Sequence, residues 1–143
     1  MLTKAKSSLV DLGQSGEDYL EAVLLLGRDS HSVRVRDVAS RLRVSRPSVV
    51  AALAQLEKRG LARHERYGAV ELTEQGRTLA EAVYRRHELL LRFLRDILGV
   101  GEQVAVEDAC RLEHALSSET AQRLLAFVEQ RESSAGAQNW EEY

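Results

Sequence analysis

Residues 36–76 carry two helical patterns and then two strand patterns, and this order restricts the possible folds more than any other feature. Residues 36–42 place apolar side chains at helical spacing. A second helix is expected over residues 49–59, because Ser45 is a good N-cap and Pro47 falls in the first turn, where a missing N–H is tolerated. Gly60 is a suitable stop for this helix. We therefore predict two short helices joined by a tight turn.

Two strand-like runs follow the second helix, over residues 61–66 and 69–72. They flank Tyr67-Gly68, which is typical of a hairpin turn, and Thr73 is placed to cap another helix. A helix-turn-helix followed by a β-hairpin is a winged helix. The sequence therefore predicts a mainly α fold with a small β wing, in which a winged helix-turn-helix forms the N-terminal part.

Further helical patterns lie on both sides of this segment. They cover residues 17–26, ended by turn residues 27–30, and then residues 75–98, 104–115 and 119–132, the last with Ser117 or Ser118 as cap. The pattern over 75–98 corresponds to about 36 Å of helix, too long for one small lobe to cover. We predict a DNA-binding domain over residues 1–74 and a helical dimerisation domain over residues 75–143, with a mobile polar tail over 133–143 that offers Trp140 and Tyr143 as docking residues.

Charge is distributed unevenly along a chain whose net charge is only −2. Residues 34–66 hold nine Lys or Arg against three Asp or Glu, whereas residues 99–143 hold three against nine. Clustered basic side chains neutralise phosphates, although a solvated basic face is the plain alternative. Together with the helix-turn-helix pattern, this charge predicts binding to double-stranded operator DNA as a homodimer.

The second predicted helix of the motif supplies the candidates for base contact, and nearby arginines supply the candidates for phosphate contact. Ser45, Arg46, Pro47, Ser48 and Ala51 are expected at the bases, and Arg36, Arg43, Arg59, Arg63 and Arg66 at phosphates. Arg46 can reach guanine or a phosphate, while Ser45 and Pro47 offer small contacts such as those with thymine methyls.

A second kind of chemistry is concentrated in Cys110-Arg111-Leu112-Glu113-His114. On a helix, this spacing points a thiol, a carboxylate and an imidazole the same way, and all three are metal ligands. Asp18 and Glu21 form another helix-spaced pair far upstream. The plain alternatives are a small buried thiol at Cys110, a solvated helix face at Glu113 and His114, and a macrodipole effect at Asp18 or, more naturally, Glu17.

Composition sets the cellular context. A single cysteine excludes an intrachain disulfide, no apolar run approaches the ~20 residues of a membrane span, and residues 1–16 lack the apolar core of a signal peptide. We expect a cytoplasmic protein with no membrane partner.

Three motifs together indicate a family: Glu17-Asp18-Tyr19-Leu20-Glu21, Arg86-His87-Glu88-Leu89 and Asp108-Ala109-Cys110-Arg111-Leu112-Glu113-His114. In this order they resemble the diphtheria-toxin-repressor family of metal-dependent transcriptional regulators. The resemblance covers roughly residues 15–130 and implies a metal-activated homodimeric repressor, not an enzyme, of the short form that resembles the manganese transport regulators and lacks the SH3-like domain of the iron repressors. The ligands it implies are Asp18, Glu21, His87, Cys110, Glu113 and His114.

The identity of the metal stays open between Mn(II) and Fe(II), with Mn(II) slightly favoured. The iron repressors that this chain resembles have a cysteine at the position of Cys110, and the manganese regulators have a glutamate there. Asp18 argues for Mn(II), because the iron repressors have a methionine at that position and a carboxylate is the harder ligand. Co(II), Ni(II), Zn(II) and Cd(II) are also expected to bind in vitro.

The number of metal ions is a separate question. The ancillary site of the iron repressors uses a histidine and a glutamate where this chain has Val106 and Leu91, so that site is not expected here. His87, Glu21 and Glu113 could serve a second ion, but Cys110 replaces the bridging glutamate of the manganese regulators. We expect one well-defined site, and any second site to be weaker.

Two other classes of function are compatible with parts of this sequence. A metal-independent winged-helix regulator would sense an organic ligand or an oxidant through Cys110, and its DNA binding would survive a chelator. A zinc hydrolase built on Cys110, Glu113 and His114 would need an open metal position and a substrate pocket, and it would leave the DNA-binding half unexplained.

Overall fold

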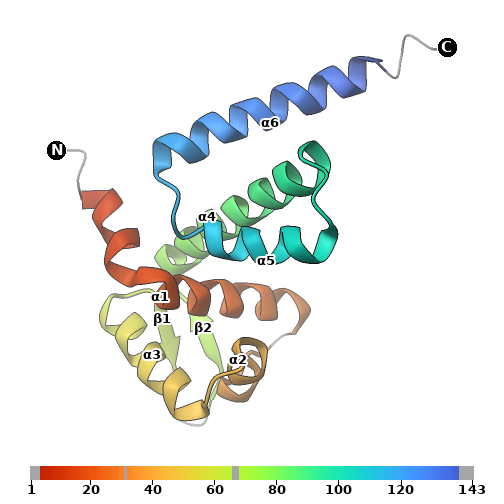
Figure 1. Cartoon of the computed structure of the whole chain (residues 1–143). Helices are drawn as coiled ribbons and strands as arrows, with labels where there is room; N and C mark the ends of the chain where they lie inside the picture. Colours follow the sequence, from red (N-terminus) through yellow and green to blue (C-terminus); the bar gives the residue numbers. More distant parts are fainter. Residues whose placement is uncertain (1–3, 31, 66–67, 139–143) are drawn as a thin grey trace. The chain divides into compact units, whose positions relative to one another are not determined.

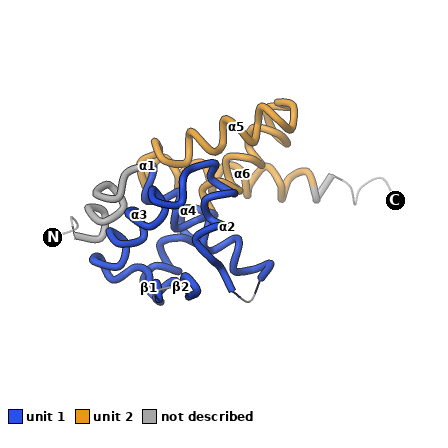
Figure 2. The backbone as a smooth tube through the Cα atoms, turned by 90° about the horizontal axis from the view of Figure 1, so that it is seen from below, with its two compact units in different colours: residues 1–84 blue, residues 85–143 orange. Residues whose placement is uncertain are grey.

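The computed structural model describes residues 4–30, 32–65 and 68–138, with side chains described for 15–30, 32–65 and 68–135. The chain forms two compact units, residues 1–84 and residues 85–143 (Figure 2). They are divided within one helix, α4 (Glu74–Arg92), whereas the domains predicted from the sequence are divided where this helix begins.

Unit 1 begins with α1 (Lys4–Asp29), which is much longer than the expected helix over residues 17–26 (Figure 1). Extending a helix adds one hydrogen bond per residue, whereas starting one is unfavourable, so residues 4–16 continue the helix beyond the segment predicted from the apolar pattern. Glu17 is therefore in the middle of α1 and is buried, 6% exposed. The macrodipole explanation for Glu17 is wrong, because that effect acts only at the first turn.

The helix-turn-helix consists of α2 (Val35–Leu42) and α3 (Arg46–Lys58). As predicted, Ser45 is the N-cap of α3: its Oγ accepts a hydrogen bond from the Ser48 amide at 3.2 Å. In the turn, Arg43 adopts a left-handed conformation with φ 56°, and its amide bonds back to the carbonyl of Ala39. One face of α3 is buried in the core, and its members are Val49, Leu53 and Leu56.

The wing is an antiparallel hairpin of β1 (Ala62–His64) and β2 (Val70–Leu72), in which Ala62 pairs with Leu72. An isolated antiparallel bridge joins Val33, just before α2, to Val70 of β2. The predicted strand runs are longer than these three-residue strands, and Arg66 and Tyr67 of the predicted turn lie outside the described residues.

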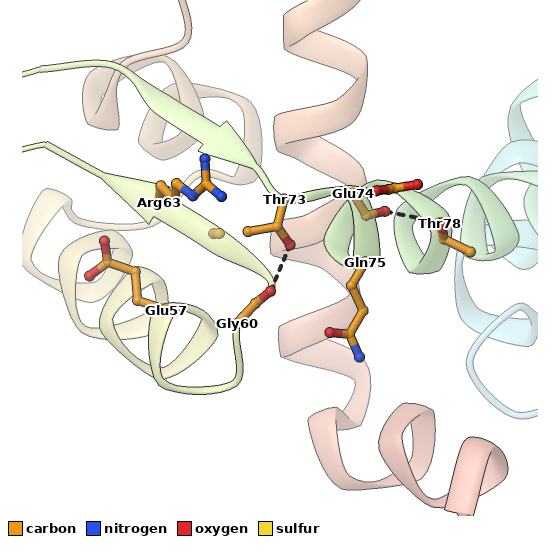
Figure 3. A pocket seen from close by; sticks show the side chains of 8 residues that line it. Glu57, Gly60, Arg63, Thr73, Glu74, Gln75 and Thr78 are labelled. Atoms are coloured by element: carbon orange, nitrogen blue, oxygen red, sulfur yellow. Dashed lines mark hydrogen bonds between the residues drawn. The ribbon is translucent and has the colours of Figure 1, made fainter.

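Thr73 connects the wing to α4, as predicted for a cap. Its Oγ1 donates to the carbonyl of Gly60 at 2.6 Å and accepts from the amide of Gly76 at 3.1 Å; Figure 3 shows the contact with Gly60 beside an open pocket at the base of the hairpin. A Cβ at position 76 would overlap the carbonyl oxygen of Leu61. Only glycine allows α4 to begin this close to the wing.

The core of unit 1 is formed where α1 packs against α2, α3 and β2. Its fully buried residues include Leu20, Val38, Val49 and Leu53. Because α1 contributes to this core over several turns, its Asp18 to Glu21 segment is held on a rigid element.

Unit 2 contains the end of α4, a π-helical turn η1 (Phe93–Ile97), α5 (Glu102–Leu112) and α6 (Ser118–Gln138). The predicted helix over 75–98 is therefore α-helical to Arg92 and π-helical beyond, with the Leu98 amide bonded to the carbonyl of Phe93. The π-helical turn ends at Ile97, one residue before the predicted end, and Gly99 follows with φ 72°. Ser117 caps α6, and this helix includes residues 133–138 of the tail that we expected to be mobile. Trp140 and Tyr143 lie outside the described residues.

A small core holds unit 2 together, with Leu90, Leu94, Ala105 and Ala109 buried. Helix α6 is joined to the α4–η1 segment by an edge-to-face contact of Phe127 with Phe93, whose ring centroids are 6.4 Å apart, and by an ion pair between Arg92 and Glu132 at 3.5 Å. None of the helices in the described part of the chain is both long and apolar enough to span a bilayer.

Candidate metal centre and nucleic-acid interface

The predicted ligands of unit 2 lie at the end of α5. This helix ends at Leu112 and not at Ala115 as predicted, but Glu113 keeps helical dihedral angles, and its amide bonds to the carbonyl of Ala109 at 3.0 Å. Cys110 and Glu113 therefore still share one helix face, three residues apart. His114 belongs to the turn that follows, so its position is set by that turn and not by helix periodicity.

Glu113 is the centre of this group. Its Oε2 lies 2.9 Å from Nδ1 of His87, and its Oε1 lies 3.1 Å from Nε2 of His114. Cys110 Sγ lies 3.8 Å from the same Nδ1 of His87. The side chain of Glu113 is 2% exposed, and those of His114 and His87 are 6% and 15% exposed. Unit 2 thus gathers four of the six predicted ligands around one buried carboxylate.

The contact between Glu113 and His87 is short, but it is not a well-aligned hydrogen bond, because Glu113 Oε2 has no hydrogen-bond partner of good geometry among the described residues. A buried carboxylate oxygen in this state is unfavourable unless a positive charge compensates it. The surrounding donor atoms are a thiol sulfur, imidazole nitrogens and carboxylate oxygens, which all bind divalent transition metals. The residues present therefore fit such an ion.

Asp18 and Glu21 belong to unit 1. They lie three residues apart on α1, so they share a face of that helix, and both are half-buried. Their participation in the same site as Glu113 stays a prediction. Val106 and Leu91, where the resemblance implies that this chain lacks the ancillary ligands, are half-buried, and Leu91 packs against the small core of unit 2.

The predicted DNA contacts are on the surface of unit 1. All of the described ones are exposed: Arg36, Arg43, Ser45, Arg46, Pro47, Ser48, Ala51, Arg59 and Arg63. Arg66 lies outside the described residues. Ser45 and Ser48 also bond to each other, with 2.8 Å between their Oγ atoms, so both hydroxyls help to begin α3.

The structure adds two candidates that the sequence reasoning missed, Val50 and Ala54. Both are exposed on α3, and Val50 is 48% exposed. Their spacing from Pro47, three and seven residues along the helix, was a signal in the sequence that could have identified them.

Arg63 is in β1, directly before His64, and the amide of His64 donates to Glu57 Oε1 of α3 at 2.6 Å. This bond connects the wing to the last turn of α3.

A winged helix in one unit and a cluster of metal-ligand side chains in the other define a class, the metal-responsive DNA-binding regulators. Residues 11–70 match the iron dependent repressor N-terminal DNA binding domain, and residues 73–139 match the iron dependent repressor metal binding and dimerisation domain. The chain belongs to this family of metal-dependent transcriptional repressors. The resemblance to diphtheria toxin repressors is thereby confirmed.

Individual relatives agree with this assignment. An uncharacterised helix-turn-helix regulator of Methanocaldococcus jannaschii is 37% identical over 120 residues, which are 82% of this chain and 95% of the relative. The transcriptional regulator MntR of Lysinibacillus sphaericus is 36% identical over 80% of this chain and 82% of its own length. The diphtheria toxin repressor of Corynebacterium diphtheriae is 36% identical over 82% of this chain but 52% of its own length.

Among solved structures, a manganese-dependent transcriptional repressor in complex with manganese is similar, with a TM-score of 0.72 and 34% identity. The match covers 80% of this chain and 52% of that one. This chain therefore spans about half the length of the diphtheria toxin repressor and of this structure.

Proposed function

We propose that the protein is a homodimeric repressor of metal-ion homeostasis genes whose affinity for operator DNA depends on a bound divalent metal ion. The observation that carries this proposal is the buried carboxylate of Glu113, within 3.1 Å of two imidazole nitrogens. A buried carboxylate is unfavourable in a helical core unless a cation compensates its charge.

The proposed ligands are His87, Cys110, Glu113 and His114 of unit 2, with Asp18 and Glu21 of α1. A divalent cation supplies the positive charge that compensates these carboxylates and the thiolate. If one ion binds both α1 and α5, the two recognition helices of a dimer sample a narrower range of distances from each other. A distance that matches two half-sites of the operator is then favoured.

We propose Mn(II) as the physiological ion ahead of Fe(II), with one well-defined site per subunit. Asp18 and Glu21 are hard oxygen ligands that suit Mn(II), whereas Cys110 is a soft ligand that raises affinity for Co(II), Ni(II), Zn(II) and Cd(II). The concentrations of metal ions in the cell decide which ion occupies the site, since affinity alone favours the later transition metals.

DNA binding is proposed for α3 and the wing. Two observations support this proposal: the described arginines of this region are exposed, and small side chains lie at the capped start of α3. Exposed arginines suit contacts with phosphates, and the N-terminal end of a recognition helix is the part that usually meets the bases. We propose that this occurs in the cytoplasm, where operator DNA lies.

Dimerisation is proposed for unit 2. Of the seven large apolar residues that are exposed in the described part of the chain, five lie in this unit: Leu98, Val104, Leu112, Leu125 and Phe127. Exposed apolar residues concentrated on one unit are typical of an interaction surface.

The test begins with selection of bound duplexes from a randomised DNA library in the presence of Mn(II). The affinity for the selected duplex is then measured by fluorescence anisotropy with Mn(II), Fe(II), Co(II), Zn(II) or a chelator. We expect the chelator to weaken binding by about 5- to 150-fold, the usual size of such coupling. Equal affinity with and without chelator would contradict the proposal and favour the metal-independent class.

A further inference from the structure

Helix α3 has a row of exposed apolar side chains on the side away from the core. Pro47, Val50, Ala51 and Ala54 lie at i, i+3, i+4 and i+7, which places them along one face of the helix. All four are exposed, and the valine is 48% exposed. This apolar row is opposite the buried face formed by Val49, Leu53 and Leu56.

A single exposed apolar residue on a protein surface is ordinary, but this row lies among positive charges. Arg43 precedes the helix, Arg46 is its first residue and Arg59 follows its last, and all three are exposed. Residues 34–66 as a whole hold nine basic against three acidic side chains. A polyanion is therefore the complementary partner, and a basic or purely apolar protein surface is not.

The chemistry of the row restricts what it can recognise on that polyanion. Proline, valine and alanine side chains have no donor or acceptor, so they cannot distinguish bases through hydrogen bonds. In the major groove of DNA, the distinctive apolar group on a base edge is the C5-methyl of thymine. The small side chains of Ala51 and Ala54 also allow the helix backbone to approach the base edges closely.

We infer that the apolar row of α3 recognises thymine methyl groups, and that Val50 is its main specificity-determining residue. Val50 is the large apolar side chain of the row that is free to contact DNA. Pro47, in contrast, also forms part of the first turn of the helix. This inference rests on the proposed DNA-binding function and deepens it by naming what α3 selects in the DNA. It predicts operators in which thymine occupies the positions beneath Val50.

The experiment is a thermodynamic cycle on the duplex selected in Mn(II). Each thymine is replaced in turn by uracil, which removes the methyl group and leaves the base pair otherwise unchanged. Affinities are measured for the wild type, Val50→Ala and Val50→Thr by fluorescence anisotropy. At one or more positions per half-site, we expect uracil to weaken wild-type binding about fourfold, the effect of withdrawing one buried methyl group.

For Val50→Ala, we expect thymine and uracil duplexes to bind equally at those positions, and for Val50→Thr, which keeps one γ-methyl, an intermediate ratio. Arg59→Ala is the matched control: as a proposed phosphate contact, it should weaken both duplexes alike and lower the salt dependence of binding. Because Val50 is exposed, its replacement should leave the unfolding free energy within about 0.5 kcal/mol of the wild type.

Two results would overturn the inference while leaving the proposed function intact. In the first, the wild type binds the selected duplex but does not distinguish thymine from uracil at any position. In the second, Val50→Ala loses affinity by the same factor on both duplexes. Selection that recovers no duplex in Mn(II) or in any other metal would instead contradict DNA binding itself.

Discussion

Oε2 of Glu113 lies 2.9 Å from Nδ1 of His87, and these two atoms come from the C-terminal end of α5 and from α4. The contact joins α4 to the end of α5 through a buried carboxylate that has no well-aligned hydrogen bond at this oxygen. It is the most direct structural reason to expect a cation in this unit.

Replacing Glu113 by glutamine tests that expectation, because the amide keeps the shape of the side chain and removes its charge. Mn(II) affinity, measured by isothermal titration calorimetry, should fall more than about 100-fold, the upper range for losing an outer-shell partner of a metal ligand. The unfolding free energy without metal should not fall, since a buried charge is removed. Glu107→Gln is the matched control on the same helix, where the carboxylate is exposed and pairs with Arg111 at 3.9 Å. Equal losses in both variants would contradict a role for Glu113 as a ligand.

Cys110→Ser tests the origin of metal selectivity. A hydroxyl is a harder and weaker ligand than a thiolate, so affinity for Co(II) and Zn(II) should fall by a larger factor than affinity for Mn(II). Wild-type protein titrated with Co(II) should also show the near-ultraviolet absorption of a cobalt–thiolate bond, and the variant should not. If this band is missing from the wild type, Cys110 is not a ligand.

Gly76→Ala tests the junction of the wing with α4. The added Cβ would overlap the carbonyl oxygen of Leu61, so we expect the unfolding free energy to fall by about 1–3 kcal/mol or more, as in other overpacked sites. Gly101→Ala is the control, because a Cβ there meets no atom within 4 Å. Urea unfolding measures both variants, and an unchanged midpoint for Gly76→Ala would show that the junction moves easily.

The double replacement Val104→Ser and Leu112→Ser tests dimerisation through α5. Both side chains are exposed, at 52% and 40%, and a fully buried Val or Leu contributes about 1.5–3 kcal/mol. We expect the dissociation constant of the dimer to rise at least about tenfold, as measured by sedimentation equilibrium. The polar pair Gln103→Ser and Glu107→Ser on the same helix should leave it unchanged. A wild type that is monomeric at all concentrations would contradict the proposal.

Local sequence signals predicted the DNA-binding unit well. Ser45 and Thr73 cap helices as expected, Gly60 has a positive φ of 72° after α3, and the buried face of α3 follows the apolar spacing. These features depend on hydrogen bonds and side chains within a few residues of one another, so they can be recognised in one chain.

Other features required the tertiary structure. The early start of α1 was not predicted, because residues 4–16 hold few large apolar residues, and the continuation of α6 to Gln138 runs through small and polar residues. The π-helical turn at Phe93–Ile97 has the same apolar spacing as an α-helix. The sequence also did not indicate that Glu17 is buried, because charged residues in an amphipathic pattern are expected at the surface.

By itself, the sequence determined the family, the winged helix and the identities of the candidate ligands, since these are carried by residue type and local spacing. Only the tertiary structure decided that His87 approaches Glu113 and Cys110, and that Val50 lies exposed among basic side chains on α3. The reason is that a ligand cluster depends on how helices distant in sequence pack together, and helix periodicity specifies only the face on which each residue lies.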